Sequence, residues 1–519
     1  MSSSPSLGDG DKNPPSVAEN QVPAPGKDHR GRVIDFLRVE EGEVYTAHSR
    51  KRPKWYQRLL DAGAEENGIK PVPAEQRTNT EYNNLFTVFF TSLFCLLPLP
   101  TGMLATLEYG MSLRDSAIII VFFAMLTCIP PALMCMAGPQ TGLRQLVQAR
   151  YSFGLYLVTI PLLLNAATII GFALMSAIVG GQAIAALNPE NVSVDIGIVV
   201  VCVGAFAASI LGYRALHWWE RWALLPNLVA IVVAVGCGGK HLHLQSDHLP
   251  PPTPFKVLTY GGLIAGYFLT FGGIVSDYSI YHDPEGPKWK ICVYTYLGLL
   301  TSSVPLLILG AAIGGAIPNV DSWAAAYEIS GIGGVILEML APSGGFGKFI
   351  MVLLALSVIG NIAMSMYSMA LNLQLLLPFL AKVPRFFFTI VTMAIMIPLA
   401  IRVAEEWETS LQNLLALIGY WAGCFDAVLI EELVVFRRMD YTTYDHAIWN
   451  VGRKLPSGIA AILASLISMA LVIPGISAVW YTGPIAKTTG DIGFEMAFIV
   501  TAIFYFPLRW LEVKWRGHL

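Results

Sequence analysis

Long apolar segments dominate this chain and restrict the folds available to it. From residue 85 onward, stretches of about 20 mostly apolar residues follow one another, and this is the length that crosses the hydrocarbon core of a bilayer. Charged residues make up 13% of the 519 residues, roughly half their share in soluble domains. Inside lipid, helices satisfy their own backbone hydrogen bonds. The chain is therefore predicted to be an all-α polytopic membrane protein.

The apolar segments predict twelve transmembrane helices. Their expected ranges are 85–107, 115–137, 153–178, 194–213, 222–239, 258–281, 290–316, 347–376, 383–402, 410–432, 457–477 and 492–512. With the N-terminus inside, the cytosolic loops hold twice as many Lys and Arg residues as the outer loops. Because positive charge is retained on the cytosolic side, both termini are expected in the cytosol.

Two of the predicted helices carry interruptions at corresponding places. The first contains the run from Pro98 to Gly102, with a second proline inside it, and the sixth contains Gly272 and Gly273. Glycine weakens a helix because it loses much backbone entropy on ordering. Broken backbone at membrane depth is tolerated only where it lines a cavity or is buried in protein. Paired interruptions of this kind indicate the binding site of a transporter built from inverted repeats.

The chain is accordingly divided into a tail and a transporter domain. Residues 1–80 are rich in Pro, Ser and Gly and are predicted to be a cytosolic, largely disordered tail. Residues 81–519 are predicted to form the transporter domain. Its two five-helix repeats are expected at about 85–239 and 258–432, and two extra helices at 457–512.

Ionisable residues inside the predicted spans are few, and their cost in lipid makes them functional candidates. Asp277 follows the interruption of the sixth helix, and it is interpreted as a proton site, a gate residue or a helix-end carboxylate. Asp426 lies deep in the tenth helix, either as a protonatable coupling group or paired with a polar group of a neighbouring helix. Further along the chain, two glutamates are expected to form surface ion pairs with two arginines: Glu431 and Glu432 with Arg437 and Arg438.

Uncharged polar residues in the third and eighth helices are the other candidates. Asn165 and Ser176 lie in the third helix, and Asn361 and Ser365 in the eighth. Because Asn361 and Ser365 are four residues apart, they share one helix face. Amides in hydrocarbon need partners. They either join neighbouring helices or bind the donors and acceptors of a heterocycle.

Several stretches of the chain resemble the fungal purine–cytosine permeases, which are part of the nucleobase–cation symporters. They are GPQTGLRQLVQARYSFG (138–154), SDYSIY (276–281), GYW with EEL and FRR (419–438), LPSGIAA (455–461) and VWYTGPIAKTTGDIGFEMAF (479–498). The order and spacing of these motifs fit from about residue 80 to the end. The resemblance implies a LeuT-type fold and symport of a neutral heterocycle with a proton across the plasma membrane.

The resemblance also implies a site between the first, third, sixth and eighth helices. Where the family has Trp and Asn on the third helix, this chain has Phe172 and Ser176. Phe271 stands where a Trp precedes the break of the sixth helix. In the eighth helix the family shows a run like NNIPN-MYS; Asn361 keeps one of its Asn residues and Ser365 replaces the last. These departures alter the positions that would bind substrate.

The expected site places a flat substrate between the rings of Phe172 and Phe271, since Phe can stack on a ring as Trp does. Gly272 would leave room for it, while Asn361, Ser365 and Ser176 would bind its polar edge. Weaker candidates are Thr91, Ser92 and Thr270, and Asp277 and Asp426 are the candidates for gating or coupling.

Cytosine and the purines adenine, guanine and hypoxanthine are the leading candidate substrates. Vitamin B6 or a secondary metabolite is the alternative within the transporter class, and a non-transporting membrane sensor is the alternative outside it. No spaced nucleophile and base, and no metal-ligand set, points to an enzyme. We expect no cofactor or metal, a proton as the coupling ion, and the lipid bilayer and a small molecule as partners, with no nucleic acid. The oligomeric state is left open.

Overall fold

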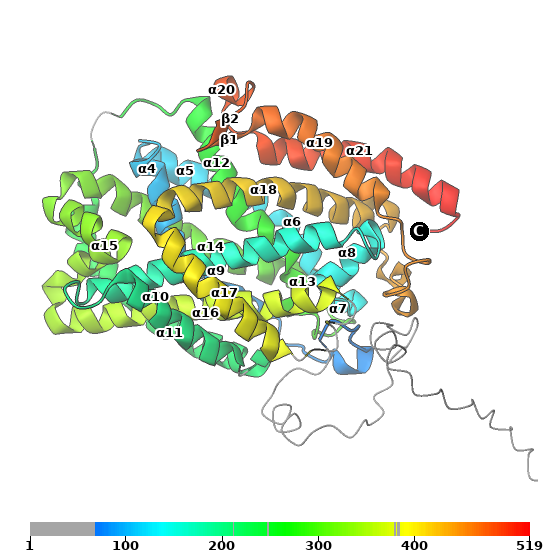
Figure 1. Cartoon of the computed structure of the whole chain (residues 1–519), viewed down its shortest axis with the longest axis horizontal. Coiled ribbons are helices and arrows are strands. Elements are labelled where there is room, and N and C mark those ends of the chain that lie inside the picture. Colours follow the sequence, from blue (N-terminus) through cyan, green and yellow to red (C-terminus); the bar gives the residue numbers. More distant parts are fainter. Residues whose placement is uncertain (1–67, 211, 247–248, 378–379, 381–382, 384) are drawn as a thin grey trace, which may run out of the picture. The chain divides into compact units, whose positions relative to one another are not determined.

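The computed structural model of this protein describes residues 68–519, apart from 211, 247–248, 378–379, 381–382 and 384 (Figure 1). Most of the predicted tail, residues 1–67, lies outside this part. Its last residues pack against the domain: the Val72 amide donates to the Gly142 carbonyl at 2.8 Å, and Asn79 pairs with His282 in a β-bridge. The predicted boundary at residue 80 therefore falls within packed chain.

Each predicted span coincides with a helix or an interrupted helix. The first two spans are α3 (Asn83–Leu93) with α4 (Pro98–Leu107), and α5 (Leu113–Thr127) with α6 (Ile129–Cys135) and α7 (Ala137–Thr141). The sixth is α12 (Pro254–Leu269), η2 (Thr270–Gly273) and α13 (Val275–Ser279). The others are α9 (Thr159–Ala186), α10 (Val194–Ile210), α11 (Gly212–Leu242), α14 (Lys288–Ala316), α16 (Gly344–Leu376), α17 (Arg385–Val403), α18 (Trp407–Glu431), α19 (Ile459–Gly475) and α21 (Gly493–Arg516).

By length and composition alone, seven helical stretches of the described chain can cross a membrane, or eight if the bent pair α3–α4 is one span. This number is below twelve for three reasons. The helices α17 and α18 form one continuous stretch, Phe386–Phe436; α10 and α19 are apolar but shorter than a full span; and α12 is interrupted after Leu269. The all-α polytopic fold is as predicted.

The remaining elements are short or lie in connections. They are α8 (Gln145–Phe153), α15 (Asp321–Leu340), α20 (Ala486–Thr489), the 3-10 turns η1 (Ala74–Gln76), η3 (Ile317–Asn319), η4 (Ala341–Ser343), η6 (Ala404–Glu406), η8 (Tyr441–Thr443) and η9 (His446–Ile448), and the π-helical η7 (Glu432–Phe436). An antiparallel pair, β1 (Ser477–Ala478) with β2 (Tyr481–Thr482), is the only sheet in the described residues.

Helix α15 was not anticipated. Three acidic residues and several glycines interrupt its apolar pattern, and the helix itself breaks at Ser330 and Gly331. Gly331 has φ +57°, a left-handed conformation that favours glycine. Figure 1 shows α15 at the opposite end of the helix bundle from α7, α8 and α13.

Both predicted interruptions are present, but the first lies earlier than expected. Helices α3 and α4 meet at an angle of 55° across residues 94–97, and the predicted run from Pro98 to Gly102 is helical, because a proline at the start of α4 lacks an N–H that would have no partner there. At the second interruption the chain forms the 3-10 turn η2, and Ile274 after it has non-helical backbone angles, φ −137° and ψ −14°. Each interruption therefore frees backbone and side chains in the middle of a membrane helix.

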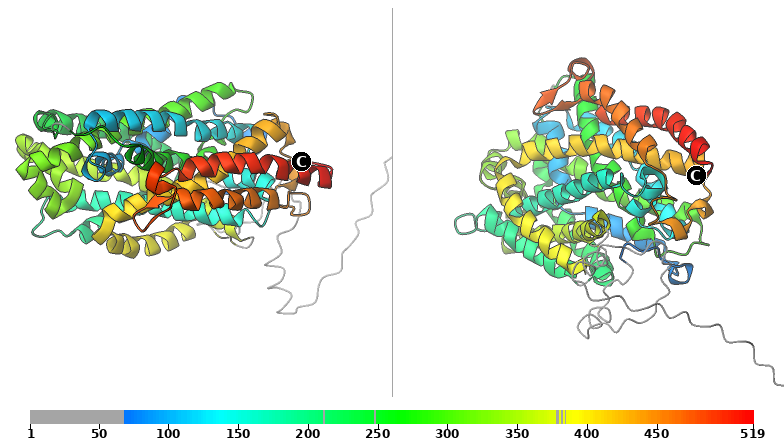
Figure 2. Two further views of the ribbon diagram at one scale, coloured as in Figure 1. Left: turned by 90° about the horizontal axis from the view of Figure 1, so that it is seen from above. Right: turned by 45° about the vertical axis from the view of Figure 1, so that its right-hand side comes forward.

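The two extra helices run side by side along α18. Helices α19 and α21 pack on each other and on α18, as the additional views show (Figure 2). They expose large aliphatic side chains, among them Leu466 at 62% and Ile503 at 60%. Apolar side chains exposed in this pattern suit contact with lipid.

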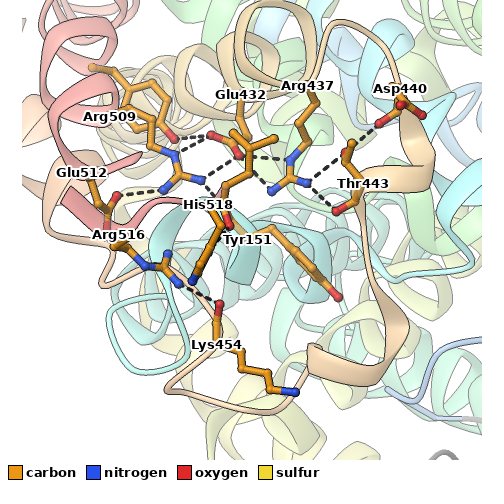
Figure 3. A network of polar contacts seen from close by, with 12 residues as sticks. Tyr151, Glu432, Arg437, Asp440, Thr443, Lys454, Arg509, Glu512, Arg516 and His518 are labelled. Carbon is orange, nitrogen blue, oxygen red and sulfur yellow. Dashed lines mark hydrogen bonds and ion pairs between the residues drawn. The ribbon is translucent and has the colours of Figure 1, made fainter. Parts of the chain in front are cut away.

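A buried ion network attaches α21 to the end of α18, contrary to the surface pairing expected for Glu432. The Glu432 side chain is fully buried and accepts hydrogen bonds from Arg437 and Arg509, each at 2.9–3.0 Å (Figure 3). Arg509 also donates to Glu512 at 2.9 Å. In this network the charges of Glu432 and Glu512 balance those of Arg437 and Arg509. Of the two arginines expected to pair with Glu432, Arg437 is the one that does so among the described contacts.

Candidate functional site

A cavity lies where both interrupted helices meet α9 and α16. The space among its lining residues that protein atoms leave empty is about 470 Å³, open solvent included. The lining residues are Leu93, Leu97, Asn165, Thr168, Ile169, Phe172, Tyr267, Thr270, Phe271, Ile274, Asn361, Met364 and Ser365. Five predicted site residues are therefore brought together: Phe172, Thr270, Phe271, Asn361 and Ser365.

Aromatic rings reach the cavity from three elements, α9, α12 and η2. Phe172, half-buried on α9, makes a T-shaped contact with the Tyr267 ring of α12, with centroids 5.8 Å apart. Phe271, on η2, makes a T-shaped contact with the Phe89 ring at 6.3 Å. Aromatic rings at the cavity can stack on a flat ligand. Tyr267 was not among the predicted site residues, because a tyrosine in a membrane helix resembles any packing residue.

The Asn361 amide is engaged with two other helices. Its Oδ1 accepts a hydrogen bond from the Ser176 hydroxyl at 2.8 Å, and its Nδ2 donates to the Ser92 carbonyl at 3.2 Å. Ser176 and Ser92 are buried and lie outside the cavity lining, so they support Asn361 from behind. Thr91 is also buried outside the lining. Asn361 thus joins α3, α9 and α16 at the cavity.

Two polar residues of α9 line the cavity that were not placed in the predicted site. Asn165 is fully buried, and neither atom of its amide has a hydrogen-bond partner among the described residues. Thr168 accepts a hydrogen bond from Trp421 Nε1 at 2.9 Å. Their spacing was the available signal, because Asn165 and Thr168 precede Phe172 by seven and four residues and so share its helix face.

The glycines of η2 touch neighbouring carboxyl and amide groups. A Cβ on Gly272 would fall 2.0 Å from Asp426 Oδ1, and one on Gly273 would fall 2.3 Å from Asn165 Oδ1. Gly272 is outside the cavity lining, so the expectation that it leaves room for substrate is corrected. It leaves room for Asp426 instead.

Asp277 links the second half of the sixth span to α8. Its Oδ1 accepts a hydrogen bond from the Gln145 amide at 2.9 Å, and Gln145 Oε1 accepts one from the Ser276 amide at 3.2 Å. The Asp277 carbonyl accepts a hydrogen bond from Arg144, which also donates to the Tyr367 hydroxyl. Asp277 itself is outside the cavity lining, although its amide donates to the carbonyl of the lining residue Ile274, and its carboxylate caps the first turn of α8.

Asp426 is an isolated carboxyl group behind the interruption. It is fully buried on α18, and neither oxygen has a hydrogen-bond partner among the described residues. Its position against Gly272 joins it to the turn that carries Phe271. The expected pairing with a polar group of a neighbouring helix is not found.

The lining of the cavity contains amides, hydroxyls, a thioether and apolar groups, and none of its residues is charged. Within the part of the chain that the structure describes, no group of three or more His, Cys, Asp or Glu side chains could hold a metal ion. The arrangement suits an uncharged, flat ligand bound between two interrupted helices. An all-α bundle with a central cavity at paired helix interruptions is the architecture of a secondary transporter.

Comparison with solved structures agrees on the fold. Mhp1, a transporter of the nucleobase–cation-symport-1 family solved in a closed conformation with bromovinylhydantoin bound, superposes with a TM-score of 0.67. The match covers 87% of this chain and 96% of Mhp1, at 15% sequence identity. The inward-facing conformation of Mhp1 gives a TM-score of 0.65.

Sequence comparison identifies the family. Residues 71–496 match the family of permeases for cytosine/purines, uracil, thiamine and allantoin, and the chain belongs to this family. A purine–cytosine permease of Emericella nidulans is 31% identical, over 92% of this chain and 94% of that protein. The vitamin B6 transporter of Saccharomyces cerevisiae is 27% identical, over 89% and 90%. The chain is thus a multi-pass membrane transporter by family, and its relatives are permeases rather than enzymes.

Proposed function

We propose that this protein is a proton-coupled symporter that imports a neutral nucleobase, cytosine or a purine, across the plasma membrane, with both termini in the cytosol. The observation that carries the proposal is the uncharged cavity, with Phe172 and Phe271 from two elements and amide and hydroxyl groups around them. A nucleobase supplies what such a lining can bind: a flat π-face and a polar edge. The similarity to a purine–cytosine permease supports the same substrates.

Asp426 is our candidate for the proton carrier. An isolated carboxylate is expensive to bury in its ionised form, so the group is expected to be protonated in this conformation. Its contact with Gly272 would connect loss of the proton to movement of η2 and of Phe271. Asp277, through α8, is our candidate for the inner gate. A proton is then the only coupling ion required, with no cofactor.

Radiolabelled uptake tests the substrate. Cells without their own nucleobase and vitamin B6 uptake would express the chain and receive cytosine, adenine, guanine, hypoxanthine or pyridoxine. We expect saturable uptake of at least one nucleobase. Uptake of pyridoxine alone would replace the proposed substrate with the vitamin B6 alternative, which the similarity to the vitamin B6 transporter supports. Ligand binding without flux would indicate a sensor.

The coupling is tested with the same cells. Uptake should rise as the external pH is lowered and should collapse with a protonophore. Asp426→Asn should abolish concentrative uptake but retain exchange of labelled for unlabelled substrate, because a fixed neutral group cannot release a proton. Uptake that ignores both pH and protonophore would refute proton coupling, and concentrative uptake by the Asp426→Asn variant would exclude Asp426 as the carrier.

A further inference from the structure

The amide of Asn165 lines the cavity and has no hydrogen-bond partner among the described residues. Asn165 lies on α9, has no exposed surface, and both its Oδ1 and its Nδ2 lack a hydrogen-bond partner among the described residues. Buried amides are almost always paired, and an exception calls for an explanation. In a cavity lining, the simplest explanation is a ligand that supplies the missing partners.

The other amide of the lining differs from Asn165. Both amide atoms of Asn361 already have partners, the Ser176 hydroxyl and the Ser92 carbonyl. These two hydrogen bonds fix the orientation of the Asn361 amide and use half of its capacity to accept and donate. Asn165 offers its acceptor and its donor with none of that capacity used by the described residues. The edge of the substrate is therefore expected at Asn165, with Asn361 holding the helices around it.

The surroundings of Asn165 keep its amide in place. Gly273 lies so close that a Cβ there would fall 2.3 Å from Oδ1. Gly273 follows Phe271 in the interrupted sixth span, and Phe172 lies two turns beyond Asn165 on the same face of α9. The amide thus lines the same cavity as both rings, next to the turn that carries one of them.

We propose that Asn165 is the specificity-determining residue of this site, and that it binds a heterocycle edge on which a hydrogen-bond donor and an acceptor are adjacent. A side-chain amide presents its acceptor and donor side by side, and Asn pairs with adenine through two such contacts. An amino group beside a ring nitrogen, or a ring N–H beside a carbonyl, fits both atoms at once. Pyridoxine lacks such an edge, so this inference, which rests on the proposed function, favours nucleobases over vitamin B6.

The test is a comparison of analogues in three proteins. Uptake of labelled adenine or cytosine, whichever is transported, would be inhibited by adenine, 1-deazaadenine and 7-deazaadenine, or by cytosine and 3-deazacytosine. Each analogue replaces one ring nitrogen beside the amino group with a C–H. The proteins would be the natural chain, Asn165→Ala and the matched control Asn372→Ala, whose buried amide nitrogen also lacks a partner but which lies outside the cavity lining.

The natural chain should prefer the parent base to one of its analogues by about tenfold, as expected for a lost hydrogen bond that leaves a buried group unpaired. Asn165→Ala should bind the parent base more weakly and lose this preference, and Asn372→Ala should keep it. The preference in the natural chain does not depend on any variant folding. The proposal would be overturned if the natural chain showed no preference for the parent base, or if Asn165→Ala kept that preference.

Thermal unfolding of the purified proteins separates binding from a structural role. Without ligand, Asn165→Ala should unfold at or above the temperature of the natural chain, because no hydrogen bond is lost. Asn361→Ala, which loses two hydrogen bonds, should unfold earlier. Earlier unfolding of Asn165→Ala to the same extent would overturn the proposal. If the natural chain transports no nucleobase, the proposed function fails and this inference fails with it; transport with no analogue preference refutes this inference alone.

Discussion

At the scale of single residues, some side chains of the cavity hold helices together and others are available to bind a ligand. Asn361 has its amide hydrogen-bonded to two other helices, whereas Phe172 is half-buried, lines the cavity and makes a T-shaped contact with the Tyr267 ring. A flat ligand in the cavity can stack on an aromatic ring of this kind.

Replacing Phe172 by Ala should therefore weaken substrate binding with little loss of stability. Stacking of a base on an aromatic side chain contributes about 1–3 kcal/mol, so the apparent KM should rise roughly tenfold or more. Phe172→Trp, which restores a larger ring, should keep or lower the KM. Radiolabelled uptake measures both. Phe349→Ala is a matched control, because Phe349 is 56% exposed on α16 and away from the cavity. An unchanged KM in Phe172→Ala would exclude Phe172 as a stacking surface.

Sequence reasoning named both Asn165 and Asn361 as candidates but could not tell which of the two amides has partners within the protein, for a physical reason. The identity of a residue shows that it can donate or accept, and its helix shows which face it is on. It does not show which distant group satisfies it. The partners of Asn361 lie 185 and 269 residues away, on α9 and α3. Only the folded arrangement reveals that Asn361 is occupied and Asn165 is not.

At the scale of helices, the interruptions depend on close packing at glycines. A Cβ on Gly102 of α4 would fall 1.9 Å from the Leu307 carbonyl oxygen, and one on Gly310 of α14 would fall 2.1 Å from the Leu99 carbonyl oxygen. The backbones of α4 and α14 thus touch through reciprocal small residues, as in many membrane helix pairs. This contact fixes α4, the second half of the first interrupted span.

Gly102→Ala should separate α4 from α14. Because the obstacle is backbone, the methyl group cannot be accommodated by a side-chain movement, and overpacking of this kind costs about 1–3 kcal/mol. The variant should unfold at lower temperature and transport more slowly. Gly236→Ala in α11 is the matched control, since a Cβ there meets nothing within 4 Å. That substitution should raise stability slightly through helix propensity. Equal melting temperatures for the two variants would contradict this account.

The helices themselves were predictable, because apolar length and interrupting Pro and Gly residues are local properties. The predicted range 258–281 contains α12, η2 and α13 together, with the break where the glycines stand. The reason for the glycines was not local. Gly272 and Gly273 were expected to leave room for a ligand, and they instead leave room for Asp426 and Asn165. Helix α15 was missed because its own break divides its apolar run.

At the scale of the whole domain, the extra helices α19 and α21 are attached to the repeats by charge. Glu432, at the end of the second repeat, binds Arg509 of α21, 77 residues later in the chain (Figure 3). Arg509 also donates to the Tyr151 carbonyl of α8 at 3.3 Å. Glu512 of α21 accepts hydrogen bonds from Ser457, just before α19. One buried network therefore joins both extra helices to the end of α18 and to α8, the helix that Asp277 caps.

Glu432→Gln should destabilise the domain strongly. The variant leaves the buried Arg437 without a countercharge among the described residues and leaves Arg509 with Glu512 alone, and removing one partner of a buried ion pair costs about 3–5 kcal/mol. The purified protein should unfold at a markedly lower temperature, and less of it should reach the membrane.

Glu405→Gln is the matched control, because the pair of Glu405 with Arg402 is 65% and 76% exposed and such pairs contribute about 0–1 kcal/mol. The double variant Glu432→Gln with Arg437→Met should recover part of the loss, since it removes the charge that Glu432→Gln leaves unpaired, while Arg509 keeps Glu512. A Glu432→Gln variant as stable as Glu405→Gln would show that this network does not hold α21 to the repeats.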